Sequence, residues 1–168
     1  LQRLTNALVH KMADDASIVN LASLAGFGWP NALEQCTAAL ALSMDDNVDD
    51  FCNAQGLDTD DSGRSYFLSK EALIIWTMQN RWTWRDRRIN MNCISPGPVD
   101  TPILDDFIQT LGARAEEDMK VMDRPGTPQD VAPVVSFALS AHAKWFRGAN
   151  LTADGGMSSH ILSNIHHF

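Results

Sequence analysis

Two short runs of residues, Ser17 to Ala22 and Ile89 to Ile94, have the length of β-strands, and a long apolar stretch of helical character separates them. The first run is mostly apolar, which suits a strand covered on both faces, and the second alternates apolar and polar residues. A third run, Ala149 to Ala153, follows a further helical stretch. Strands that alternate with helices form parallel sheets with right-handed crossovers. We therefore predict an α/β fold with a parallel sheet.

Apolar periodicity and composition predict helices over residues 1–12, 31–44, 65–84, 105–121 and 128–139. Thr127 is expected to cap the last of these with Pro128 at its first position, and Ser62 or Ser65 to cap the helix near residue 65. The arginines within residues 85–88 suit the C-terminal end of that helix, where its dipole is negative. No capping residue precedes the first helix, so we expect its true start upstream of Leu1.

Residues 27–63 are predicted to form an acidic insertion. Between Met12 and Gly63 there are ten acidic residues and no Lys or Arg. We interpret the carboxylates as solvated rather than as a metal site, because no D-x-D-x-D-G pattern with a closing Glu occurs. Connections of this length are often lids or binding loops. With Phe27 and Trp29 at its start, the insertion is predicted to cover a hydrophobic substrate.

Composition excludes several classes of protein. The 168 residues suit a single domain, and a formal charge of -8 with scattered basic residues argues against nucleic acid as a partner. No apolar run of membrane-spanning length occurs, so we expect a soluble protein without a membrane partner. Three cysteines without C-x-x-C spacing indicate neither a disulfide framework nor a zinc site, and a reducing, cytoplasmic setting fits best. The histidines of the tail, residues 160, 166 and 167, are interpreted as surface residues rather than ligands.

Tyr66 and Lys70 form the most informative pair in the sequence. Residues four apart share one face of a helix, about one turn from each other. An unperturbed phenol has a pKa of about 10, too high for a general base near neutral pH, but a neighbouring positive charge favours the phenolate. Ser23 lies at the exit of the first predicted strand, and Pro96 and Gly97 lie at the exit of the second. Because open α/β sheets bind ligands at the carboxyl ends of their strands, these residues are expected to form one site.

Four motifs, taken in their order along the chain, resemble those of the short-chain dehydrogenase/reductase family. They are the serine strand of residues 18–26, the Tyr66-x-x-x-Lys70 pair, the Ser95-Pro96-Gly97-Pro98 loop and the terminal Ala153-Asp154-Gly155-Gly156. The insertion, together with residues 124–128, is similar to the branch containing bacterial 3α-hydroxysteroid dehydrogenase/carbonyl reductase and coniferyl-alcohol dehydrogenase. The resemblance implies a Rossmann-like doubly wound parallel sheet, with residues 1–168 as the C-terminal part of a single domain and its N-terminal part missing.

The resemblance also implies roles for individual residues. Tyr66 would be the general acid/base, Lys70 would favour its phenolate form and bind the nicotinamide ribose, and Ser23 would hold the substrate oxygen. Pro96, Gly97, Val99 and Thr101 would line the nicotinamide of NAD or NADP, with NAD favoured by the branch. The expected reaction transfers a hydride between this cofactor and a hydrophobic secondary or aromatic alcohol or its carbonyl form. A homodimer or homotetramer is expected, as is common in the family.

Two features depart from the family pattern. The glycine-rich turn that binds the cofactor's pyrophosphate has no counterpart in these residues, and neither has the residue that selects NAD or NADP. The catalytic asparagine cannot be assigned to Asn6, which lies too close to the end of the first helix. The alternative is therefore a truncated, non-catalytic fragment that acts as a structural or interaction module. A serine hydrolase is less favoured, because Ser23 lacks the first glycine of a G-x-S-x-G elbow.

Overall fold

Three parallel strands form the centre of the molecule. The computed structural model describes residues 1–57, 63–102, 104, 108 and 120–168. Strands β1 (Ser17–Leu21), β2 (Asn90–Pro96) and β3 (Asn150–Ala153) pair in the order β1-β2-β3, with Leu21 opposite Ile94 and Pro96 opposite Ala153. The central strand β2 is buried along nearly its whole length, as parallel strands covered on both faces usually are. The predicted α/β fold and its three strands are confirmed.

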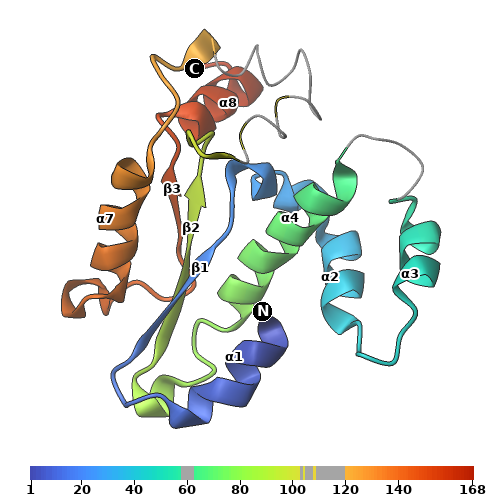
Figure 1. Cartoon of the computed structure of the whole chain (residues 1–168), viewed down its shortest axis with the longest axis vertical. Helices are drawn as coiled ribbons and strands as arrows, with labels where there is room; N and C mark the ends of the chain where they lie inside the picture. Colours follow the sequence, from blue (N-terminus) through green and yellow to red (C-terminus); the bar gives the residue numbers. More distant parts are fainter. Residues whose placement is uncertain (58–62, 103, 105–107, 109–119) are drawn as a thin grey trace.

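Helices cover both faces of this sheet. Helix α4 (Arg64–Gln79) lies on one face and α7 (Pro128–Leu139) on the other (Figure 1). Helix α7 begins as predicted after Thr127, whose backbone N–H and hydroxyl both donate to Asp130 Oδ2, at 2.7 and 2.8 Å. Helix α4 instead has Gly63 as its N-cap, while Ser65 lies inside the helix. The expected cap by Ser65 is therefore wrong, and Ser62 lies outside the described residues.

Several shorter elements complete the fold. Helix α1 (Gln2–Leu8) continues into the 3-10 turn η1 (Val9–Lys11), and α8 (Met157–His166) follows β3 in a tail for which the sequence predicted no helix. Further 3-10 turns are η2 (Leu24–Gly26), η3 (Trp29–Asn31), η4 (Arg85–Arg87) and η5 (Ala141–Ala143). The helix predicted over residues 105–121 lies almost wholly outside the described residues. The helices that the structure describes are too short or too polar to span a membrane.

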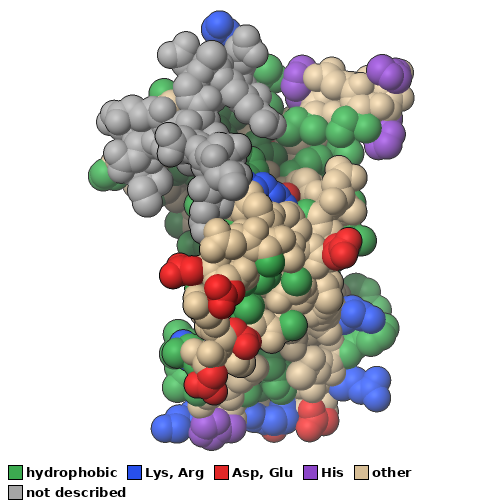
Figure 2. Space-filling view, turned by 90° about the vertical axis from the view of Figure 1, so that its right-hand side faces the viewer, with side chains coloured by type: hydrophobic (Ala, Val, Ile, Leu, Met, Phe, Trp, Pro, Cys, Tyr) green, Lys and Arg blue, Asp and Glu red, His purple; other side chains and the backbone are tan. Residues whose placement is uncertain are grey.

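The acidic insertion contains two helices that dock on α4. Helix α2 (Leu33–Ala41) is a shorter form of the predicted helix, whereas α3 (Val48–Gln55) was not predicted. Their apolar side chains share a core with α4 that includes Cys36, Leu57, Leu68 and Ile75. Acidic side chains lie on the surface on this side of the molecule (Figure 2). The exposed acidic residues of the insertion that the structure describes are Glu34, Asp45, Asp46, Asp49 and Asp50. Within the described ranges, no cluster of His, Cys, Asp or Glu is arranged to hold a metal ion.

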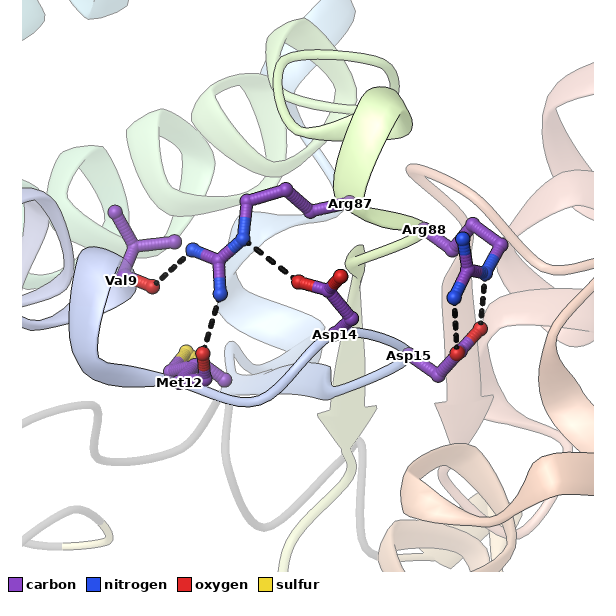
Figure 3. Close-up of polar contacts among 6 residues, drawn as sticks. All are labelled: Val9, Met12, Asp14, Asp15, Arg87 and Arg88. Carbon is purple, nitrogen blue, oxygen red and sulfur yellow. Dashed lines mark hydrogen bonds and ion pairs between the residues drawn. The ribbon is translucent and has the colours of Figure 1, made fainter.

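At the N-terminal ends of β1 and β2, two arginines form ion pairs that connect the turns before these strands. Arg87 Nε pairs with Asp14 Oδ1 at 2.9 Å, and Arg88 binds both carboxylate oxygens of Asp15 at 2.7 Å (Figure 3). Arg87 also donates to the carbonyl oxygens of Val9 and Met12. Because α4 ends at Gln79, the expectation that residues 85–88 complement its dipole is wrong. They hold the turn before β2 against the turn before β1.

Candidate active site

The carboxyl ends of β1 and β2 bring Ser23 and the Pro96–Gly97 loop to the same edge of the sheet. Because Leu21 is paired with Ile94, Ser23 and Pro96 each lie two residues beyond that pair. Ser23 is half-buried and caps the 3-10 turn η2, where its hydroxyl oxygen accepts a hydrogen bond from the Ala25 N–H at 3.1 Å. The chain turns sharply after the serine, which leaves its side chain at the strand end.

Tyr66 and Lys70 lie on the first two turns of α4, beside this edge (Figure 1). Lys70 Nζ lies 5.6 Å from the centroid of the Tyr66 ring and donates to the Leu21 carbonyl oxygen at 3.2 Å. The ammonium therefore contacts both the tyrosine ring and the last residue of β1. Partial burial lowers the pKa of Lys70, because removal from water disfavours its charged form. Tyr66 itself is 41% exposed, so its ring remains accessible from outside.

A glycine explains why the serine turn can approach α4 so closely. A Cβ atom on Gly26 would lie 2.8 Å from the Lys70 carbonyl oxygen and 2.6 Å from Ile74 Cδ1. Both distances are shorter than van der Waals contact, so a side chain at this position would push η2 away from the helix. Sequence reasoning missed this role of Gly26, although a glycine three residues after the serine is a visible signal of close backbone approach.

The loop after β2 is held from both sides. The Gly97 N–H donates to the Ala153 carbonyl oxygen at 3.2 Å, and Val99 forms a parallel bridge with Gly126. The bridge uses the Pro98 carbonyl oxygen and the Asp100 N–H, so the backbone N–H and C=O of Val99 point to the other side. The Thr101 hydroxyl donates to the Val99 carbonyl oxygen at 3.3 Å. The loop thus presents backbone polar groups and one hydroxyl near the sheet edge.

A cleft of about 380 Å³ extends this edge beyond the loop, at the end of β3. Its charged lining residues already have partners within the chain. Arg124 pairs with both carboxylate oxygens of Asp130, at 2.8 and 3.0 Å, and Asp154 accepts hydrogen bonds from the N–H groups of Gly156 and Ser158. Along the sheet edge, the order is therefore Ser23, the Pro96–Thr101 loop and this cleft.

Comparisons with known proteins agree with this geometry. A family model described as enoyl-(acyl carrier protein) reductase matches residues 54–158. Coniferyl-alcohol dehydrogenase from a Pseudomonas species is 35% identical over 95% of this chain and 62% of its own length. The 3-alpha-hydroxysteroid dehydrogenase/carbonyl reductase of Comamonas testosteroni is 29% identical over 56% of this chain and 38% of its own length. The chain thus spans less than two thirds of these curated relatives.

Solved structures have the same fold. A short-chain dehydrogenase/reductase from Serratia marcescens superposes with a TM-score of 0.60 at 24% identity, and the match covers 92% of this chain and 50% of that one. At this identity the likeness concerns the arrangement of strands and helices. It agrees with the three-stranded sheet and the helices on its two faces.

Proposed function

The chain belongs to the short-chain dehydrogenase/reductase family, and from this membership we propose that it carries the acid/base part of an NAD(P)-dependent oxidoreductase. The proposed reaction transfers a hydride between the nicotinamide and a hydrophobic secondary or aromatic alcohol or its carbonyl form. The single observation that carries the proposal is the position of the Lys70 ammonium, between the Tyr66 ring and the end of β1.

Tyr66 is the proposed general acid/base. In carbonyl reduction, its hydroxyl gives a proton to the substrate oxygen, and in alcohol oxidation the phenolate takes that proton. Lys70 is the proposed partner of Tyr66 in this step, because its half-buried ammonium lies 5.6 Å from the centroid of the tyrosine ring. The Ser23 hydroxyl is proposed to donate to the same substrate oxygen as negative charge develops on it. The Ala25 N–H occupies only a lone pair of the Ser23 oxygen, so this bond leaves the hydroxyl proton available for donation.

The described residues fit the nicotinamide end of the cofactor. Lys70 offers an ammonium for the ribose hydroxyls, and the outward N–H of Val99 offers a donor for a carboxamide. The Val99 carbonyl oxygen and the Thr101 hydroxyl bond each other, but each keeps a lone pair for a carboxamide N–H. Pro96 and Gly97 are proposed to line the ring. When bound, the nicotinamide supplies or accepts the hydride. NAD rather than NADP, and assembly as a homodimer or homotetramer, are part of the proposal.

Substrate preference is proposed to be hydrophobic. Trp29 packs against the cores on both sides of α4, so the start of the insertion is anchored beside the helix that carries Tyr66. Phe27 lies two residues earlier and is half-buried. A lid formed by the insertion over the substrate stays a prediction, which rests on this proximity and on the apolar residues at its start.

The test is an assay of the full gene product for NADH and NADPH oxidation with ketones and aromatic aldehydes. Tyr66→Phe should lower kcat by at least about 100-fold, because it removes the proton-transfer group but keeps the ring. Thr83→Val is the control, since among the described residues its hydroxyl bonds within its own turn, to Asn80 Oδ1 at 3.0 Å. Equal turnover in the parent and in Tyr66→Phe would refute the mechanism.

A second candidate function, a non-catalytic interaction module, is favoured by the surface of α1. None of its residues is buried, and Leu1, Leu4 and Leu8 are exposed by 63, 59 and 47%. An apolar helix face of this kind is typical of a surface covered by another protein segment. Titration calorimetry with NADH distinguishes the two candidates, because a module without cofactor chemistry gives no binding heat, whereas the proposed oxidoreductase binds NADH saturably.

A further inference from the structure

A carboxylate is buried in α4 directly after Lys70. Glu71 is only 4% exposed, and its Oε2 atom lies 2.8 Å from the Arg64 guanidinium. Arg64 and Glu71 are seven residues apart, so they lie on one face of the helix, while Tyr66 and Lys70 lie between them in the sequence. Burial of a charged group is costly unless a partner offsets it. The ion pair therefore spans the two helical turns that carry the proposed acid/base pair.

The same guanidinium connects α4 to the insertion. Arg64 donates through its second terminal nitrogen to Gln35 Oε1 on α2 at 2.6 Å, and Gln35 Nε2 donates to the Gln55 carbonyl oxygen at the end of α3 at 3.1 Å. From the side of η3, a Cβ on Gly28 would lie 2.9 Å from Glu71 Oε1, so this turn also closes over the carboxylate. One arginine thus joins α2, α3 and α4.

The first turn of α4 needs such an anchor. Its N-cap is Gly63, which has no side chain to accept a hydrogen bond from the free N–H groups, and residues 64–67 include no acidic side chain. Arg64 also places a positive charge at the positive end of the helix dipole, which is unfavourable without a counter-charge. Pairing with Glu71 supplies this counter-charge and ties the turn that bears Tyr66 to the body of the helix.

We propose that Arg64, Glu71 and Gln35 are positioning residues, which couple the insertion to the first two turns of α4 and so set where Tyr66 and Lys70 lie relative to Ser23. This inference rests on the proposed function for its effect on turnover, but the mechanical coupling itself does not. The insertion then has a role in placing the acid/base residues as well as any role near the substrate.

Two substitutions of Arg64 in the full gene product distinguish a positioning role from a role as counter-charge for the buried Glu71 carboxylate. Arg64→Gln leaves the Glu71 carboxylate buried without its counter-charge. Arg64→Lys keeps the charge but lacks the fork that binds Glu71 and Gln35 together. Arg87→Gln is the matched control, because the Arg87 side chain is 30% exposed against 29% for Arg64 and also joins a carboxylate to another segment. Its contacts are with Val9, Met12 and Asp14, which precede β1 (Figure 3).

If Arg64 is a positioning residue, Arg64→Gln should lower kcat by about 10- to 100-fold with a smaller change in KM. The reason is that small displacements of catalytic groups have large effects on rate. Arg64→Lys should restore the thermal midpoint but keep kcat at least about fivefold below the parent. Arg87→Gln should lower the midpoint and leave kcat unchanged. The proposal is overturned if Arg64→Lys restores kcat fully. It is also overturned if kcat falls in proportion to the thermal midpoint in all three variants.

A second measurement keeps the test independent of activity. Amide hydrogen exchange of residues 64–70 should be about tenfold faster or more in Arg64→Lys than in the parent, while residues 74–79 of the same helix change little. Unchanged exchange over residues 64–70 overturns the coupling, whatever the assay gives. If exchange responds as expected but the parent has no turnover, the proposed function fails and the coupling stands.

Discussion

Replacement of Gly26 with alanine should separate the serine turn from the helix that carries Tyr66 and Lys70. The added Cβ would lie 2.6 Å from Ile74 Cδ1, 2.8 Å from the Lys70 carbonyl oxygen and 2.9 Å from its carbonyl carbon. Ile74 is fully buried and cannot move aside easily, and the Lys70 atoms belong to the helix backbone. Ordinary contact begins at 3.4 Å, so η2 and α4 must move apart by about 0.8 Å to relieve the contact with Ile74.

The displacement sets the expected magnitude. Overpacking of this kind typically costs about 1–3 kcal/mol. For a chain of this size, each kcal/mol lowers the thermal midpoint by about 2–4 °C, so we expect a fall of roughly 2–12 °C. Because Ser23 moves with the turn, the proposed function implies that kcat falls by about tenfold, less than the effect expected for a misplacement of 1 Å.

Differential scanning calorimetry and steady-state kinetics measure the two effects. Gly126→Ala is the matched control, since its Cβ would lie 3.4 Å from the Pro98 carbonyl oxygen and 3.7 Å from Val99 Cγ2, which is close to ordinary contact. Its midpoint should stay within about 2 °C of the parent, because an alanine that fits also restricts the unfolded chain. Equal midpoints for Gly26→Ala and Gly126→Ala would refute the reasoning.

Two further predictions concern titration and reactivity. The Arg124 guanidinium, with help from Thr127, holds the pKa of the Asp130 carboxyl well below its usual range. A carboxyl whose pKa is depressed in the folded state adds stability above its unfolded pKa of about 3.9, and that stability is lost as the pH falls from there towards the folded value. Calorimetry from pH 7 to pH 3 should therefore show a falling midpoint that is shallower in Asp130→Asn, and identical slopes would contradict this. Burial raises the pKa of the Cys36 and Cys93 thiols to about 11, so both should react far more slowly with iodoacetamide at pH 8 in the native protein than in urea. Mass spectrometry of the labelled peptides would count against their burial if it found equal rates in the two conditions.

Local patterns predicted the strands and helices that the structure confirms. Residue type and spacing indicated β1, β2 and β3, because strand length and side-chain burial are properties of short runs. The Thr127-Pro128 start of α7 was also visible, since capping depends on neighbouring residues. Helix α3 was missed, although Asn47, which accepts hydrogen bonds from the N–H groups of Asp49 and Asp50, is a capping signal.

Contacts between distant residues could not be predicted in the same way. Arg87 and Arg88 were assigned to a helix end, but they bind Asp14 and Asp15, 73 residues away in the sequence. The sequence singled out Ser23, Tyr66, Lys70 and the Pro96–Thr101 loop as site residues, and it predicted that parallel strands would gather them at one edge.

What the sequence by itself determined was the order of strands and helices and the chemistry of the side chains at the strand ends. Only the tertiary structure decided how closely the elements approach. It placed Gly26 against the Lys70 backbone and joined Arg64 to both Glu71 and Gln35. The reason is physical: periodicity and capping are set by neighbours within one or two turns, whereas contact between a strand exit, a helix and an insertion depends on how the whole chain fills space.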